Sequence, residues 1–247
     1  MTYEWFFSGR PGGVSTGPMA SLNLGAAVGD DPAAVAENRR RFAERAGLPA
    51  GQVLWMNQVH SATVRRVGSA DLGAEIEATD GLVTTEPGLG LAVGVADCVP
   101  VLAADRVNGV IAAVHAGRRG AADGIALEMV AQMVAAGAQT GSVEVVLGPA
   151  ICGLCYEVPP AMQAEVVIAL PGSGSRTRTG TAGLDLRAGL EAQLTAAGVK
   201  SVLVDNRCTA EDPELFSHRR DAPTGRQAGL IRLTGGVSQP PPGTGGR

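Results

Sequence analysis

The sequence contains almost no lysine. Its 247 residues include one, Lys200, and arginine supplies the rest of the 20 basic side chains. A P-loop needs a lysine before Ser or Thr after a glycine-rich turn, and no glycine precedes Lys200 at the required spacing. A Schiff-base mechanism would depend on Lys200 alone. Arginine is therefore almost the only side chain available to hold a phosphate group.

Histidine and cysteine are also scarce. The three histidines are His60, His115 and His218, and no two of them have the i, i+4 spacing of a helical zinc-protease motif. Four cysteines are too few for a disulfide scaffold in a chain of this length.

Long apolar runs and an excess of positive charge are both missing. No run approaches the roughly 20 apolar residues of a membrane span, and the first residues lack the pattern of a signal peptide. The formal net charge of −4 gives no basic footprint for nucleic acid. We therefore expect a cytoplasmic protein with reduced cysteines, which binds neither nucleic acid nor a membrane.

The remaining pattern is that of an α/β protein. Three close segments at 90–96, 99–104 and 109–114 are almost continuously apolar, as in strands that are covered on both faces. Asp31 as N-cap and Gly47 as terminator predict a helix between them. The other expected strands are 3–8, 52–56, 62–67, 82–84, 143–147, 199–204 and 228–233. The other expected helices are 119–136, 160–169 and 184–197.

These elements predict a single catalytic domain over residues 1–234. Its expected class is α/β (α+β), with mixed β-sheets flanked by helices. The segment from Pro171 to Gly183 consists mostly of Gly, Ser, Thr and Arg, which predicts a mobile surface loop. Residues 235–247 are rich in proline and glycine and predict a disordered tail.

Three potential metal ligands lie at expected strand ends. His60 follows one strand, Cys98 separates two apolar strands, and His115 ends another. Two imidazoles and one thiolate suit a catalytic zinc, with a fourth position left for water whose pKa the metal lowers. The alternative interpretation is that His115 is a core histidine and Cys98 a small buried apolar residue.

Two other segments carry polar groups that could react or bind. CGLC at 152–155 could be half a zinc site or a redox pair, but no second CxxC exists and Cys208 is a single further thiol. Buried structural thiols are the favoured interpretation. The segment 216–226 holds three arginines that could grip phosphate or a carboxylate, or form a solvated turn. We expect His218 on the surface or behind the site.

Together these motifs resemble the bacterial laccase-domain proteins. That family is variously labelled multicopper polyphenol oxidoreductase, purine nucleoside phosphorylase and peptidoglycan editing factor. The matching motifs are GGVS at 12–15, SLNLG at 21–25, VGDDP at 28–32, ENR at 37–39, NQVH at 57–60, DGLV at 80–83, ADCVPVL at 96–102, HAG at 115–117, FSHRRD at 216–221 and TGR at 224–226. They occur in the family's order and cover about residues 8–233.

The resemblance implies that His60, Cys98 and His115 bind one zinc ion. It implies a fold related to certain toxin deamidase domains. The implied activity is phosphorolysis of adenosine, inosine, guanosine and methylthioadenosine, with adenosine deamination as a second activity. One departure is visible, since the family usually has tryptophan directly after His-Ala-Gly, where this chain has Arg118.

Roles follow for the charged residues near these motifs. Phosphate needs cations, and the candidates to bind it, in order of preference, are Arg10, Arg119 and Arg39. The carboxylates of Asp97 and Asp80 could orient a metal ligand or move protons. Alternatively, Asp80 only forms a turn and Arg39 an ion pair on a helix surface. The expected catalytic set is Cys98, His60, His115, Asp97 and Arg119. The expected substrate- and phosphate-binding set is Arg10, Asn23, Arg39, Gln58 and Asp80.

We therefore expect a zinc-dependent purine nucleoside phosphorylase, a monomer or homodimer, with purine nucleosides and phosphate as its partners. The first alternative is a cysteine hydrolase that edits peptidoglycan precursors, with Cys98 as nucleophile and His115 as base. Copper-dependent phenol oxidation ranks lower, because it needs several histidine-rich sites and copper is the less favoured metal here. A structural zinc protein without catalysis is the last alternative.

Overall fold

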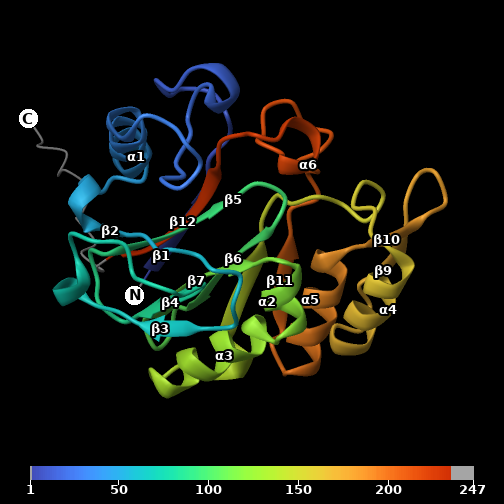
Figure 1. The fold of residues 1–247 in the computed structure, drawn as a ribbon. Coiled ribbons are helices and arrows are strands. Elements are labelled where there is room, and N and C mark those ends of the chain that lie inside the picture. Colours follow the sequence, from blue (N-terminus) through green and yellow to red (C-terminus); the bar gives the residue numbers. More distant parts are fainter. Residues whose placement is uncertain (1, 235–247) are drawn as a thin grey trace, which may run out of the picture.

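Two β-sheets lie face to face in the computed structural model, which describes residues 2–234, and helices cover their outer faces (Figure 1). The four-stranded sheet has the order β1 (Thr2–Phe7), β12 (Gln227–Thr234), β5 (Gly90–Val95) and β2 (Val53–Leu54). The six-stranded sheet has the order β11 (Ser201–Val204), β8 (Val143–Leu147), β6 (Val99–Asp105), β7 (Val110–Ala116), β4 (Gly81–Thr84) and β3 (Val64–Arg66).

Both sheets are mixed, as the sequence predicts. In the six-stranded sheet β11 pairs with β8 and β3 with β4 in parallel, whereas the central pairs are antiparallel. In the four-stranded sheet β12 runs antiparallel to both β1 and β5, and β2 is parallel to β5. The expected α/β class with mixed sheets and flanking helices is confirmed.

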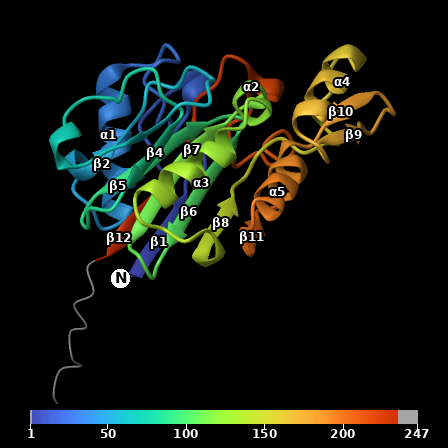
Figure 2. The same ribbon diagram turned by 90° about the horizontal axis from the view of Figure 1, so that it is seen from below.

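The helices form the outer layers. The α1 helix (Pro32–Arg45) lies over the four-stranded sheet, and α3 (Ile125–Ala135) and α5 (Leu186–Ala196) lie over the six-stranded sheet (Figure 2). The short helices are α2 (Arg118–Ala122) and α6 (His218–Asp221), and α4 (Pro160–Ala169) stands beside a hairpin of β9 (Gly174–Arg176) and β10 (Ala182–Leu184). Single 3₁₀ turns occupy Gly17–Met19, Ala50–Gln52, Ser69–Asp71 and Thr140–Ser142.

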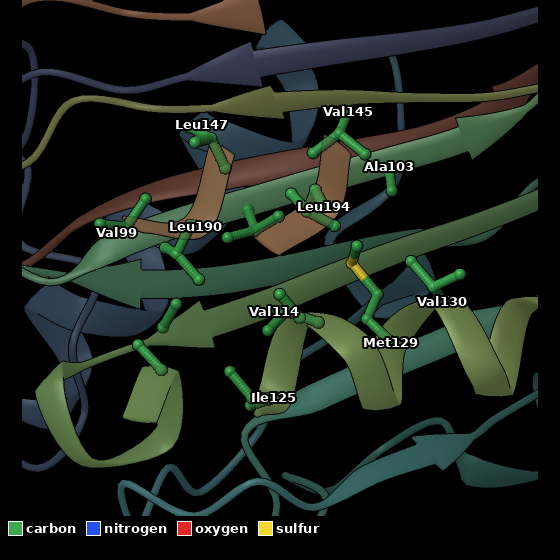
Figure 3. Close-up of a cluster of buried hydrophobic side chains, with 14 of the residues drawn as sticks. Val99, Ala103, Val114, Ile125, Met129, Val130, Val145, Leu147, Leu190 and Leu194 are labelled. Carbon is green, nitrogen blue, oxygen red and sulfur yellow. The ribbon is translucent and has the colours of Figure 1, made fainter. Parts of the chain in front are cut away.

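Apolar side chains fill all three interfaces between the layers. Between the two sheets Leu91 and Leu102 are fully buried. Figure 3 shows the next interface, in which Met129 of α3 and Leu190 of α5 face the six-stranded sheet. Every residue of β6 and β7 is buried. These strands are covered on both faces, which explains their almost continuous apolar sequence.

Two sequence predictions need correction. The expected helix at 119–136 is two helices, because Gly124 between them adopts a φ of 86°, in the left-handed region that interrupts a helix. The expected mobile loop from Pro171 to Gly183 is largely the β9–β10 hairpin, whose preceding Ser173 is fully buried and accepts an amide hydrogen bond from Asp185 at 2.7 Å.

The expected tail at 235–247 lies outside the described residues. Within the described part of the chain, no helix is both long enough and apolar enough to cross a membrane.

Candidate active site

Strand register places His115 beside Asp80. Antiparallel pairing of β4 with β7 sets Gly81 opposite Val114, so the residues next to this pair also meet. The backbone N–H of His115 donates to the Asp80 carbonyl at 2.7 Å, and His115 Nδ1 lies 2.8 Å from Asp80 Oδ1. Since Nδ1 is engaged by the carboxylate, Nε2 is the ring nitrogen left for a metal.

His60 and Cys98 complete a cluster with His115. One ligand atom from each residue lies within 4.8 Å of the others, and the two imidazole rings stand 4.7 Å apart at 70°. His115 is buried, Cys98 is half-buried and His60 is exposed, so the cluster opens toward solvent on one side. Gly117 lies against the cluster, where an added Cβ would be 2.6 Å from His60 Nδ1.

Asp80 organises this cluster from a fully buried position. Its carboxylate accepts the amides of Val59 at 3.2 Å, His60 at 3.0 Å and Ser61 at 2.7 Å, together with the Ser61 hydroxyl at 2.8 Å. Burial by itself would raise the pKa of Asp80, but the hydrogen bonds from His115 and Ser61 lower it to about 2. Asp80 is therefore an ionised acceptor that fixes both the backbone around His60 and the ring of His115.

The two imidazoles have different electrostatic surroundings. Partial desolvation of its ring lowers the pKa of His60, and the neighbouring His115 lowers it further. Burial opposes the charged form of His115, yet its contacts with Cys98 and Asp80 raise its pKa to about 9. His115 is thus held between a thiol and a carboxylate.

A cavity of about 580 Å³ opens over the cluster. Its polar and aromatic lining residues are Arg39, Trp55, Asn57, Gln58, His60, Glu75, Asp97, Cys98, His115, Arg118, Tyr156, His218, Arg219 and Arg226. This volume falls in the range of small-molecule sites in proteins.

On the α1 side of the cavity, a cation lies against an aromatic ring. The Arg39 guanidinium stands 4.1 Å from the ring centre of Trp55, donates to the Leu24 carbonyl at 3.0 Å, and pairs with Glu75 at 2.8 Å. Arg39 is therefore more than the surface ion pair of the alternative interpretation.

Among the predicted binding residues, Gln58 lines the cavity and Asn23 does not. Both ends of the Gln58 amide bond Gly94, since Gln58 donates to the Gly94 carbonyl at 2.9 Å and accepts the Gly94 amide at 3.0 Å. The buried Asn23 joins loops, because it donates to Asp30 at 2.8 Å and accepts the Arg226 amide at 2.8 Å.

Arg10 and Arg119 are not among the residues that line the cavity. The Arg10 guanidinium donates to the Ala20 carbonyl at 2.7 Å and stands 5.2 Å from the ring centre of Phe216. Arg119 is exposed on α2. The neighbouring Arg118 does line the cavity. It occupies the position at which the family that this sequence resembles usually has tryptophan.

Asp97 joins three segments of the chain at the cavity wall. It has a φ of 84°, a left-handed conformation that aspartate tolerates better than most residues. Its carboxylate accepts the Thr209 hydroxyl and the Arg219 amide, each at 2.6 Å, and its carbonyl accepts the Ile151 amide at 3.0 Å. The contacts that the structure gives Asp97 therefore position the wall of the site.

Sequence reasoning missed several lining residues, among them Trp55, Asn57, Glu75 and Tyr156. Asn57 is the first residue of the NQVH motif and Trp55 lies two residues before it, which was an available signal. Glu75 and Tyr156 had no comparable signal, because tertiary packing alone brings them to the cavity.

Residues 4–234 match the family described as multi-copper polyphenol oxidoreductase laccase. The chain belongs to this family. The resemblance inferred from the motifs is thereby confirmed, and the match spans both sheets.

Members of the family with curated names are closely similar. A protein of Mycobacterium tuberculosis named purine nucleoside phosphorylase is 55% identical over 222 residues, which cover 90% of this chain and 88% of that relative. A Corynebacterium glutamicum protein of the same name is 53% identical over 228 residues, covering 92% and 93%. The crystal structure of YlmD from Geobacillus stearothermophilus superposes with a TM-score of 0.89 at 36% identity, covering 94% and 92%.

Proposed function

We propose that this chain is a zinc-dependent purine nucleoside phosphorylase that also deaminates adenosine. The proposed substrates are adenosine, inosine, guanosine and methylthioadenosine, each cleaved with phosphate. The observation that carries the proposal is the cluster of His60, Cys98 and His115 beneath an arginine-lined cavity. The names of the relatives support the reaction class.

The cluster fits zinc in its chemistry. Two imidazoles and one thiolate are donors that zinc prefers, and three protein ligands leave a position open to a substrate or water. The carboxylate of Asp80 behind His115 is the usual support for such a ligand. When bound there, zinc supplies Lewis acidity at the cavity floor. Copper is the less favoured metal, since the three histidines of the chain cannot build several histidine-rich copper sites.

Arginines at the cavity are the proposed phosphate ligands. Arg39 retains its predicted role, and Arg118 and Arg226 join it because they line the cavity, whereas Arg10 and Arg119 do not. Burial lowers the pKa of Arg226, while the nearby Cys98 and Asp97 favour its charged form. A guanidinium in this setting holds phosphate more strongly than it would in water.

The nucleoside is expected to span the cavity between the cluster and the α1 side. Its ribose hydroxyls need acceptors, and we assign this role to Glu75 and Asn57, which line the cavity. Glu75 is already oriented by Arg39. Gln58 and Asp97 hold the cavity walls, so we assign them positioning roles.

The test follows inosine and adenosine by chromatography with and without phosphate. We expect free base and ribose 1-phosphate only when phosphate is present, and inosine from adenosine without it. Cys98→Ala should lose the zinc ion of this cluster and both activities, while the exposed Glu165→Gln on α4 keeps them. Arg118→Met should raise the KM for phosphate more than the KM for inosine. Failure of the zinc-loaded protein to turn over any purine nucleoside would overturn the proposal.

A cysteine hydrolase is the second candidate, favoured by the two side-chain contacts of His115. His115 hydrogen-bonds both Cys98 and Asp80, which is the order of a nucleophile, a base and its orienting carboxylate. An amide in a peptidoglycan precursor would then be the substrate. Alkylation separates the two candidates: a metal-free, active protein that loses activity when Cys98 is alkylated supports the hydrolase and contradicts the metalloenzyme.

A further inference from the structure

Three cysteines and one glutamate gather outside the cavity. Ligand atoms of Cys152, Cys155, Cys208 and Glu211 all lie within 4.8 Å of one another. The sulfur atoms of a tetrahedral zinc site with Zn–S bonds of about 2.3 Å are about 3.8 Å apart, so small side-chain movements would close this set around an ion. The group shares no residue with the cluster of His60, Cys98 and His115.

Strand pairing explains how distant residues come together. The parallel neighbours β8 and β11 pair up to Leu147 opposite Val204, and both segments leave the same edge of the sheet. Beyond this edge the segments remain in contact, through an isolated bridge between Ala150 and Cys208 and a hydrogen bond from the Thr209 amide to the Ala150 carbonyl at 3.2 Å. Each segment therefore brings one pair of ligands to the same place.

The two ligand pairs have the same local geometry. In the first, the carbonyl of Cys152 accepts the amides of Cys155 and Tyr156, both at 3.0 Å. In the second, the carbonyl of Cys208 accepts the amides of Glu211 at 3.1 Å and Asp212 at 2.9 Å. Both are thus C-x₂-ligand turns that place the first and last side chains together, the spacing found in structural zinc sites.

Hydrogen bonds already join the two turns of the cluster. The Cys152 amide donates to Cys208 Sγ at 3.3 Å, and Cys155 Sγ donates to Glu211 Oε1 at 3.2 Å. Arg178, from the β9–β10 hairpin, pairs with the same Glu211 oxygen, and its amide donates to the Leu154 carbonyl at 3.2 Å. Three thiolates and a carboxylate around a divalent ion would carry excess negative charge, which Arg178 partly offsets.

We propose that Cys152, Cys155, Cys208 and Glu211 form a second, closed metal site that binds Zn²⁺. Thiolates favour zinc over magnesium or calcium, and four protein ligands leave no open position, so the ion is structural. Binding replaces the thiol protons by metal–sulfur bonds and releases those protons to solvent, with no change of oxidation state.

The site would hold two walls of the cavity together. Ile151 and Tyr156, which flank the first turn, line the cavity. Thr209, next to Cys208, donates to Asp97 at 2.6 Å. A metal that joins the two turns therefore fixes residues of the candidate active site without contacting the substrate. The proposal does not depend on which reaction the cavity performs.

Metal analysis of purified variants tests the site directly. We expect two zinc ions per wild-type chain, one in Cys98→Ala/His115→Ala, and one in Cys152→Ser/Cys155→Ser. Glu214→Gln, an exposed change on the same segment as Glu211, should retain two. The proposal is wrong if the folded Cys98→Ala/His115→Ala protein holds no metal, or if the serine variant binds as much as the wild type.

A milder variant keeps the test independent of folding. Glu211→Gln preserves all three thiols, and we expect its zinc affinity at this site to fall by more than the 10–100-fold that is typical of changes behind a metal ligand. With Co²⁺ as the probe, sulfur-to-metal charge-transfer absorption should persist in Cys98→Ala/His115→Ala with about three-quarters of its wild-type intensity, since three of four Co–S bonds remain. Loss of that absorption, or a Cys152–Cys155 disulfide in the freshly purified protein by mass spectrometry, overturns the proposal.

Discussion

Replacing Gly117 with alanine tests whether His60, Cys98 and His115 act as one metal site. An added Cβ would lie 2.6 Å from His60 Nδ1 and 3.2 Å from Cys98 Sγ. The backbone of Gly117, with φ −74° and ψ 169°, accepts alanine without strain. The substitution therefore inserts one methyl group between two ligands and leaves every ligand in the chain.

The size of the effect follows from the distances. Ordinary van der Waals contact begins near 3.4 Å, so the His60 ring must retreat by about 0.8 Å and the Cys98 sulfur by a few tenths. Metal–ligand distances tolerate only about 0.2 Å. We expect zinc affinity to fall about 10–100-fold. Since His60 is exposed, we expect its ring to turn outward, so the free energy of unfolding of the metal-free protein should change by less than about 1 kcal/mol.

The assay is a competitive zinc titration against a chromophoric chelator, combined with urea unfolding in the presence of EDTA. A Cys152→Ser/Cys155→Ser background removes two ligands of the second candidate site, so the titration reports on this cluster. Gly94→Ala is the matched control, because its Cβ would meet Gln58 Oε1 at 3.7 Å, an ordinary contact in the same cavity. If Gly117→Ala binds zinc as tightly as Gly94→Ala does, the three residues do not share a metal.

Two further predictions concern buried carboxylates. Asp80→Asn should lower zinc affinity about 10–100-fold and the free energy of unfolding by about 3 kcal/mol, because an amide cannot accept all the hydrogen bonds donated to Asp80. Metal titration and urea unfolding measure the two effects, and unchanged values would contradict the prediction. Burial by itself would raise the pKa of Asp105, but hydrogen bonds from Asn108 and Ser142 lower it to about 2. Its folded pKa is below the unfolded value of 3.8, so its contribution of about 2 kcal/mol is present above pH 4 and lost as the pH falls toward 2. Urea unfolding should therefore show a shallower loss between pH 5 and pH 3 in Asp105→Asn than in the wild type, and parallel profiles would refute the assignment.

Local patterns were sufficient to predict the layers of the fold. Continuous apolar sequence in β6 and β7 indicated strands covered on both faces, and the structure buries both strands completely. The Asp31 cap indicated the start of α1, where its side chain accepts the Ala33 amide. One local pattern was misleading, because the polar composition at 171–183 predicted a mobile loop where the structure has the β9–β10 hairpin.

Site residues could be predicted where the residue type is scarce in the sequence, and they remained uncertain where the residue type is abundant. Two of three histidines and one of four cysteines stood at strand ends, and the structure clusters them. Arginine is abundant, so sequence alone could not separate Arg226, which lines the cavity, from Arg10, which does not. That distinction depends on packing between segments more than 200 residues apart.

The Cys208 turn shows why a motif search fails when one ligand differs. The sequence has one CxxC and no second, so Cys208 looked like a single thiol. Its partner at the third following position is Glu211, and only the parallel pairing of β8 with β11 reveals that the two turns face each other.

In the four-stranded sheet, strands that lie side by side are far apart in the order of translation. Among the strands of residues 2–234, β12 is the last to be translated, and it lies between β1, the first of them, and β5. Thr2 pairs with Thr234, and within residues 2–234 β12 is the sheet neighbour of β1. Until β12 is made, β1 lacks the neighbour that it has in the described sheet, and β5 presents an open edge that invites aggregation. Arg226 reaches the cavity just ahead of that strand. A nascent chain can therefore build the six-stranded sheet early, yet it completes the cavity only after nearly its whole described length has been translated.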